Sequence, residues 1–231
     1  MMRYCVYIYF LIIPFLSNSQ VFEFGLHVTP SLSYRISSNS QNNPNAQSIE
    51  IGEKGIYTFD FGVDLKRSLG TRWKMGTGLL YSQKGFANNN VGAIYQLDFP
   101  EISHIDYVQD YLEVPLFLNY LINPGEKLEY YASLGITNAF LLNDKNNVIF
   151  RSQLIADKDY TKLQEPYLNS NGIYHFGIRW GMGTQFSIDE KYSFGLEPIF
   201  KLSFTELEES RFETSRKLIS FGLDFRFIKR I

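Results

Sequence analysis

The chain has 231 residues and a net charge of −2, with a pI near 6.0, so its charge balance does not indicate a nucleic-acid partner or a polybasic contact with a membrane surface. Twenty Phe and sixteen Tyr accompany a mean hydropathy of only −0.16, a combination that argues against a helical membrane protein. Cys5 is the one cysteine, so a chain that has lost its first residues would have no disulfide, thiol nucleophile or thiolate metal site.

The N-terminus predicts a secretory signal. Arg3 precedes an apolar run from Val6 to Leu16, and small or polar residues end the segment at Ser19. We expect cleavage after Ser19, which makes residues 1–19 the signal peptide and residues 20–231 a single mature domain. No later stretch approaches the ~18 consecutive apolar residues of a membrane-spanning helix.

Eight later segments alternate, with a period of two, between apolar or aromatic residues and Gly, Ser or charged residues. In chain order they occupy residues 21–36, 57–66, 73–84, 111–120, 128–136, 174–188, 192–204 and 219–227. A strand directs successive side chains to opposite faces, so each segment presents one apolar and one polar surface. These lengths exceed the ~5–6 residues of an ordinary strand and suit the ~9–11 that cross a bilayer. The pattern predicts an all-β fold, an eight-stranded antiparallel transmembrane up-and-down β-barrel.

The connections between these segments alternate between long and short. The predicted loops are residues 37–53, 85–105, 143–172 and 206–215, and the predicted turns are 68–71, 123–125 and 189–191. All three turns fall at the same end of the barrel. Short periplasmic turns and long extracellular loops are typical of outer-membrane barrels. We therefore expect an integral protein of a Gram-negative outer membrane, surrounded by its lipid, with both termini in the periplasm.

The charged residues test this register, because Lys or Arg on the lipid face at mid-membrane costs about 2–4 kcal/mol. With the apolar face outward, the charges of the strand centres point inward, and exceptions such as Arg67, Asp110 and Lys217 lie at strand ends. The predicted lumen charges are Glu23, Asp60, Asp64, Lys66, Lys74, Lys84, Glu113, Glu129, Arg179, Glu197, Lys201, Asp224 and Arg226. Two interpretations follow: a salt-bridged plug, which we favour because eight strands enclose little more than their own side chains, or a pore lining.

Aromatic residues are predicted to form two girdles at the membrane boundaries. Tyr34, Tyr57, Tyr81 and Tyr174 lie toward the loop ends of their strands, and Trp73, Tyr120, Tyr130 and Tyr192 lie toward the turn ends. Three prolines fit a closed barrel poorly, since a closed sheet has no free edge to accommodate a missing N–H. We expect Pro30, Pro115 and Pro198 to mark bulges or strand extensions outside the membrane.

Three segments carry a family resemblance: residues 111–116 (YLEVPL), residues 130–135 (YYASLG) and residues 76–85 (GTGLLYSQKG). The chain resembles the Bacteroidetes-type outer-membrane β-barrel proteins called PorT-like, over essentially the whole mature length. The resemblance implies a barrel fold. It also implies that some relatives serve protein secretion and gliding machinery, but it transfers no functional residue beyond the motifs.

No pattern in the sequence indicates catalysis. His27 and His175 lie on non-neighbouring strands, His104 falls in a predicted loop, and neither HExxH nor GxSxG occurs. We expect no enzyme activity, catalytic residue, cofactor or metal site.

Two function classes remain open. The first is a non-enzymatic barrel whose extracellular loops bind a partner protein of the envelope or a surface ligand. The second is a narrow channel for ions or small solutes through the charged lumen. A soluble lipocalin-like binder is disfavoured because its barrel would be apolar inside and polar outside.

Overall fold

A computed structural model describes residues 22–38, 53–88, 101–151, 174–205 and 215–231. The strands are β1 Phe22–Ser38, β2 Glu53–Lys54, β3 Ile56–Leu69, β4 Trp73–Asn88, β5 Glu101–Leu121, β6 Leu128–Arg151, β7 Tyr174–Ser187, β8 Tyr192–Ser203 and β9 Ser215–Arg230. Within these residues, no helix has the length and apolar character to cross a membrane. The predicted signal peptide, residues 1–19, lies outside the described part.

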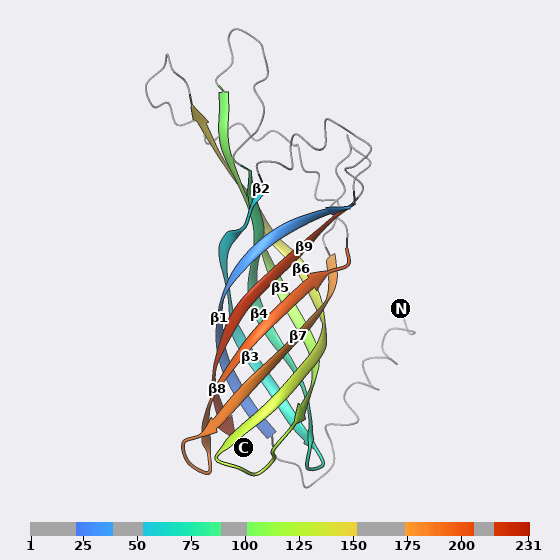
Figure 1. Cartoon of the computed structure of the whole chain (residues 1–231), viewed down its shortest axis with the longest axis vertical. Coiled ribbons are helices and arrows are strands. Elements are labelled where there is room, and N and C mark those ends of the chain that lie inside the picture. The colour runs from blue at the N-terminus through green and yellow to red at the C-terminus, as the bar shows by residue number, and fades with distance from the viewer. Residues whose placement is uncertain (1–21, 39–52, 89–100, 152–173, 206–214) are drawn as a thin grey trace.

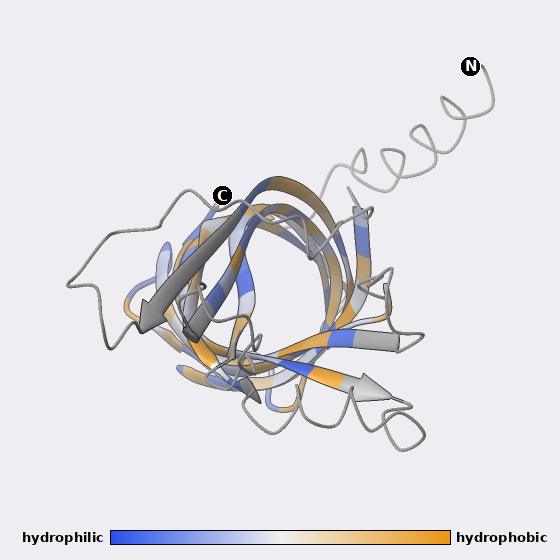
Figure 2. Ribbon diagram, turned by 90° about the horizontal axis from the view of Figure 1, so that it is seen from above, coloured by the Kyte–Doolittle hydropathy of each residue, from blue (hydrophilic) through white to orange (hydrophobic). Residues whose placement is uncertain are grey.

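Eight of these strands form a closed antiparallel barrel. The sheet order is β4-β3-β1-β9-β8-β7-β6-β5, and a β4–β5 pairing closes it. Strand β1 pairs with both β3 and β9, which joins the first barrel strand to the last. The two-residue β2 pairs with the loop end of β4 and does not enter the ring. Figures 1 and 2 show the barrel from the side and from above. The predicted up-and-down topology is confirmed.

The three short connections lie at one end of the barrel, called here the turn end (Figure 1). Gly70 and Gly125 have φ values of 83° and 86°, a conformation that glycine adopts without steric cost. In the third turn, Asp189 Oδ1 accepts the N–H groups of Lys191 and Tyr192 at 2.7 and 2.6 Å. The opposite end, where β1 leads out and β9 leads in, is called the loop end.

The strands alternate as the sequence predicts. In β7, Arg179 and Gln185 are buried, whereas the outward-facing Trp180 and Met182 are 41% and 67% exposed. In β9, the buried Asp224 and Arg226 alternate with the exposed Phe225 and Phe227. The buried interior is therefore polar and the exposed wall apolar, as expected for a barrel in lipid.

The prolines are accommodated without the bulges that the sequence analysis expected. Each one coincides with a two-residue gap in the strand pairing on one side: between β1 and β9 at Pro30, between β4 and β5 at Pro115, and between β7 and β8 at Pro198. The register is the same before and after each gap, so no residue is inserted. At Pro115 the carbonyl still accepts the Thr77 hydroxyl at 2.9 Å. The missing N–H groups thus cost local ladder bonds and leave the barrel closed.

The loop boundaries around β5 were wrong. Much of the predicted loop 85–105 belongs to β4 and β5, and β6 continues to Arg151, well into the predicted loop 143–172. Residues 101–110 and 143–151 pair with each other, with register shifts at Ile102/His104 and Asp110/Tyr111. Residues 105–110 also pair with β4, so the two-stranded part that projects beyond the other strands at the loop end is residues 101–104 with residues 149–151, called here the β5–β6 ribbon (Figure 1).

Candidate functional site: the charged lumen

The predicted lumen charges all lie buried inside the barrel. Residues contributing to this set are Glu23, Asp60, Asp64, Lys66, Lys74, Lys84, Glu113, Glu129, Arg179, Glu197, Lys201, Asp224 and Arg226, and none is more than 7% exposed. Opposite charges lie close together in three groups along the barrel axis. Burying an ionised group is tolerable only with such pairing.

The turn-end group is centred on Lys74 of β4. Its ammonium lies 2.9 Å from Glu23 and 3.4 Å from Glu129. Glu23 also accepts from Arg230 at 3.4 Å and from Gln185 at 3.5 Å. Four strands are therefore tied together across the turn end: β1, β4, β6 and β9, with Gln185 adding β7.

The middle group is centred on Arg226 of β9. Its guanidinium contacts Asp224, lies 2.7 Å from Glu197 and lies 3.8 Å from Asp64. Asp224 further accepts from Thr29 at 3.0 Å and lies 3.3 Å from His27. A guanidinium suits this position because its several N–H donors can engage more than one carboxylate at once.

Two more cations, Arg179 and Lys66, complete the middle group. Arg179 lies 3.9 Å from Glu197, and Lys66 lies 3.9 Å from Asp64. The ring of Phe117 lies 4.9 Å from the Arg179 guanidinium carbon and 5.9 Å from the Lys66 ammonium, so it offers both a cation–π surface.

The loop-end group is centred on Lys201 of β8. Its ammonium lies 2.7 Å from both Asp60 and Glu113. Glu113 also pairs with Lys84 at 3.1 Å, and Asp60 accepts the Ser82 hydroxyl at 2.7 Å. Cations and carboxylates from β3, β4, β5 and β8 therefore meet across the lumen.

Two aromatic side chains also belong to this interior: Phe117, which the alternation of residues 111–120 predicts on the inward face, and Tyr131, which the structure adds. Phe117 and Tyr131 are both 2% exposed, and the Tyr131 hydroxyl donates to Glu197 at 3.3 Å. A Cβ on Gly76 would lie 2.5 Å from the Phe117 ring, so this glycine makes room for it. Both rings lie in the inward phase of their strands, a signal that the sequence carried.

The three charged residues that were predicted at strand ends, Arg67, Asp110 and Lys217, differ in position and burial. Arg67 is buried near the turn end of β3, and Lys217 is half-buried near the start of β9. Asp110 does not lie at a strand end, because β5 begins at Glu101. It is buried beside a register shift and accepts from Gln83 at 3.0 Å.

The girdle residues all lie on the outward face of their strands. At the turn end the rings of Trp73 and Tyr120 are 4.8 Å apart, Tyr130 is exposed, and Tyr192 stacks on Phe227. Toward the loop end the tyrosines are Tyr34, Tyr57, Tyr81 and Tyr174. Of these, Tyr57 is 91% exposed, and the other three are less exposed than this. Their assignment to membrane boundaries stays a prediction.

The three histidines do not come together. His27 belongs to the middle charge group and His175 lies near the loop end. His104 was predicted in a loop but lies in β5, paired with Ile149 of β6. Among the described residues, no group of three or more potential ligands is placed to hold a metal ion.

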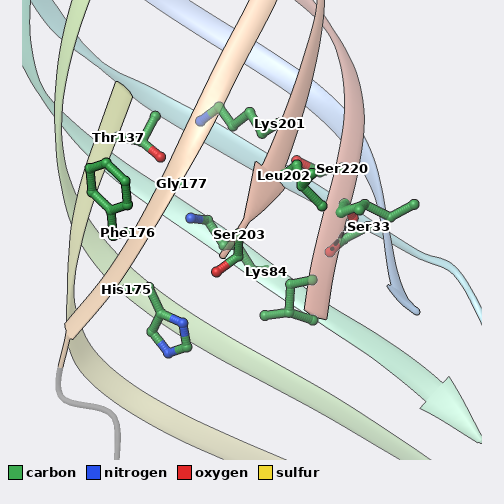
Figure 3. Close-up of a pocket in the computed structure, with 12 residues that line it drawn as sticks. Ser33, Lys84, Thr137, His175, Phe176, Gly177, Lys201, Leu202, Ser203 and Ser220 are labelled. Atoms are coloured by element: carbon green, nitrogen blue, oxygen red, sulfur yellow. Dashed lines mark hydrogen bonds between the residues drawn. The ribbon is translucent and has the colours of Figure 1, made fainter. Parts of the chain in front are cut away.

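A small pocket adjoins the loop-end charge group, and apolar side chains such as Phe176, Leu202 and Leu218 form part of its wall (Figure 3). Its lining includes Lys84, Thr137, His175, Lys201, Ser203 and Ser220. These residues come from β4, β6, β7, β8 and β9, so the pocket belongs to the lumen of the barrel.

The chain is similar to several proteins of solved structure. Among solved structures, the chain is similar to the outer membrane protein OprG from Pseudomonas aeruginosa, with 11% identity, a TM-score of 0.48, and coverage of 93% of this chain and 96% of that one. It is also similar to Neisserial surface protein A (8% identity, TM-score 0.42, 88% and 95% covered) and to Ail of Yersinia pestis (12%, 0.37, 89% and 97%). No curated protein matches the chain.

The family assignment rests on a family model that matches more than half of the chain. The family model described as "outer membrane protein beta-barrel domain" matches residues 18–201, most of the chain. The closed antiparallel sheet and the apolar outer wall agree with that match. The chain therefore belongs to the outer membrane protein β-barrel domain family and is an integral outer-membrane barrel.

Proposed function

We propose that this barrel is a non-enzymatic scaffold whose loop-end segments bind a partner protein of the envelope or a surface ligand. The observation that carries the proposal is the filled lumen. Lys74, Arg226 and Lys201 each contact carboxylates on other strands of the barrel, at successive levels along its axis. A rigid, internally paired barrel is suited to presenting segments at its rim.

The β5–β6 ribbon supports the same proposal. It continues beyond the level at which β4 pairs with β5, which ends at Asn88 and Ile105, and beyond the level at which β6 pairs with β7, which ends at Phe140 and Tyr174. A strand pair that leaves the barrel wall can present backbone and side chains to another protein.

We place both termini in the periplasm. The N–H of Phe22 donates to the carbonyl of Ile231, and the N–H of Ile231 donates to the carbonyl of Phe22, at 3.3 and 2.8 Å, so both ends of the barrel chain meet at the turn end. Short turns face the periplasm in barrels of this class. The loop end would then face the cell exterior.

Membership of the PorT-like group is part of the proposal. The three segments that carry the resemblance lie on β4, β5 and β6, which are neighbours in the wall, with Gly76 opposite Phe117 and Phe117 opposite Gly135. They form one continuous part of the barrel that contains Glu113 and Lys84. This arrangement fits an accessory of an envelope or secretion assembly.

The second candidate is a narrow channel for ions or small solutes. The observation that favours it is the small pocket at the loop end, whose wall includes Lys84 and Lys201. Conduction would require the Arg226, Lys201 and Lys74 contacts to open together, which makes it the weaker candidate.

The test is the native mass of the tagged full-length protein after gentle extraction from outer membranes, with mass spectrometry of co-eluting proteins. We expect a stoichiometric partner that is lost when residues 143–173 are replaced by a short Gly-Ser linker. Glu190→Lys in the β7–β8 turn is the control and should retain the partner. A lone monomer for the wild-type protein would contradict the proposal, and a partner lost equally from the Glu190→Lys variant would show that it binds elsewhere.

A further inference from the structure

His175 places a buried polar side chain near the loop end of β7. It is 3% exposed, and neither ring nitrogen has a hydrogen-bond partner among the residues that the structure describes. Its ring packs edge-on against Tyr111, with centroids 5.1 Å apart and an interplanar angle of 84°. A buried imidazole normally satisfies its N–H, because leaving it unpaired costs free energy. The position is therefore incomplete without a further polar group.

Among the residues that the structure describes, the wall of the pocket beside His175 carries hydrogen-bond donors and no carboxylate. Lys84 and Lys201 line it together with the hydroxyl groups of Ser203 and Ser220 (Figure 3). Asp60 and Glu113 pair with these lysines but do not belong to the lining. Two ammonium groups in the wall disfavour a cation and favour an anion.

Lys84 and Lys201 differ in the number of carboxylates that they contact. Lys201 holds two carboxylates at 2.7 Å each. Within the described residues, Lys84 makes one ion pair, at 3.1 Å to Glu113, and lies 5.2 Å from the Tyr111 ring. An ammonium has three donors, so Lys84 retains capacity for a second acceptor.

We propose that this pocket binds one oxygen atom of a small oxyanion, the carboxylate or phosphate group of a solute that arrives from the loop end, because its free volume of about 10 Å³ is close to the space that one water-sized atom needs. The oxyanion accepts hydrogen bonds from the His175 ring and from the Lys84 ammonium, and the hydroxyl of Ser203 or Ser220 completes its shell. The site is independent of the proposed loop-end partner, because it lies within the lumen and uses residues of the barrel wall. It also requires no conduction, since the Lys201 contacts with Asp60 and Glu113 close the lumen next to it.

The test uses the full-length protein in detergent micelles, with inorganic phosphate and acetate as separate probes. Calorimetry measures affinity, and nitrogen-15 NMR of the histidine side chains reports whether the His175 ring is affected. We expect saturable binding of at least one probe with a shift of the His175 resonances. Preference for phosphate would point to a phosphorylated solute, and preference for acetate would point to a carboxylic acid.

Two variants locate the site. His175→Phe retains the ring contact with Tyr111 and should weaken binding about tenfold or more, the effect of losing about 1.4 kcal/mol. Lys84→Met should weaken it similarly while Lys201 still holds Glu113. Ser193→Ala, a buried lumen position of β8 near the turn end, is the control and should bind as the wild type does.

Failure to bind either probe saturably would overturn the proposal and indicate that water alone fills the pocket. Binding that survives both His175→Phe and Lys84→Met would also overturn it. Heat-modifiable migration on gels verifies that each variant is folded, and the two substitutions test the site separately if one of them fails this check.

Discussion

The inner and outer faces of the barrel wall differ more than any two of its strands do, although every strand contributes to both. Outside, residues such as Leu134 and Met182 present apolar surface, at 64% and 67% exposure. Inside, one residue away along the same strands, Ser133 and Gly183 belong to a polar, charge-paired interior. A shift of one residue would exchange the two faces of a strand, so lipid and lumen together fix the register.

The largest expected effect on the free energy of unfolding comes from removing the central cation of the middle charge group. Arg226→Met leaves Asp224 and Glu197 buried with fewer partners, and we expect it to destabilise the barrel by about 3–5 kcal/mol. Urea unfolding of the barrel in lipid vesicles measures this loss. Lys191→Met, at an exposed turn lysine, is the control and should unfold as the wild type does. Equal stability of Arg226→Met and wild type would show that the central ion pairs are not structural.

A charge placed on the outer face should cost slightly less. Met182→Arg puts a cation on the exposed wall of β7, and we expect a loss of about 2–4 kcal/mol if this position lies near mid-membrane. The same unfolding measurement applies, with Met182→Leu as the matched control. Full stability of Met182→Arg in vesicles would mean that this face of the barrel does not contact lipid.

Two glycines, one in a tightly packed part of the interior and one in a looser part, test how closely the interior is packed. Gly76→Ala forces its new methyl group against Phe117, and we expect a loss of about 1–3 kcal/mol from overpacking. At Gly195 the nearest atom to an added Cβ is 3.4 Å away, so Gly195→Ala should change stability little. If the two variants were equally stable, the Phe117 ring would not be confined as the structure shows.

The smallest expected effect concerns the proposed girdles. Replacing Tyr120 by Ala removes its ring contact with Trp73, a pair separated by 4.8 Å, and should cost about 0.5–1.5 kcal/mol beyond the lost apolar area. A fluorescence shift of the tryptophans to longer wavelength on the same substitution would support a boundary position for Trp73. No change in either stability or emission would contradict the girdle assignment at this end.

The fold could be predicted because alternation has only two phases and the connections alternate in length. The features that were not predicted lie where neither the alternation nor the length of the connections is informative. Segments 101–110 and 143–151 lack the regular alternation of apolar and polar residues that lipid imposes, so they resemble loops although their backbones pair. Pro30, Pro115 and Pro198 looked incompatible with a closed sheet because the sequence does not show that a ladder can lose two pairings and keep its register.

The sequence predicts which charged residues face the lumen, but it does not predict which of them form ion pairs with one another. The alternation of inward and outward residues along each strand is enough to place Asp60, Glu113 and Lys201 in the lumen. Their mutual contact depends on strand tilt and stagger around the barrel, since Lys201 is 141 residues from Asp60 and 88 from Glu113 in sequence. The pocket beside His175 could not be predicted for the same reason, because its lining comes from strands whose relative stagger the sequence does not state.

Ion conductance of the full-length protein in planar lipid bilayers tests whether paired charges close the lumen. We expect no stepwise conductance from the wild-type protein, because the contacts of Lys74, Arg226 and Lys201 block the axis at three levels. Steady conductance that disappears when Arg179 or Glu113 is replaced by Gln would contradict it and establish the lumen as an ion path.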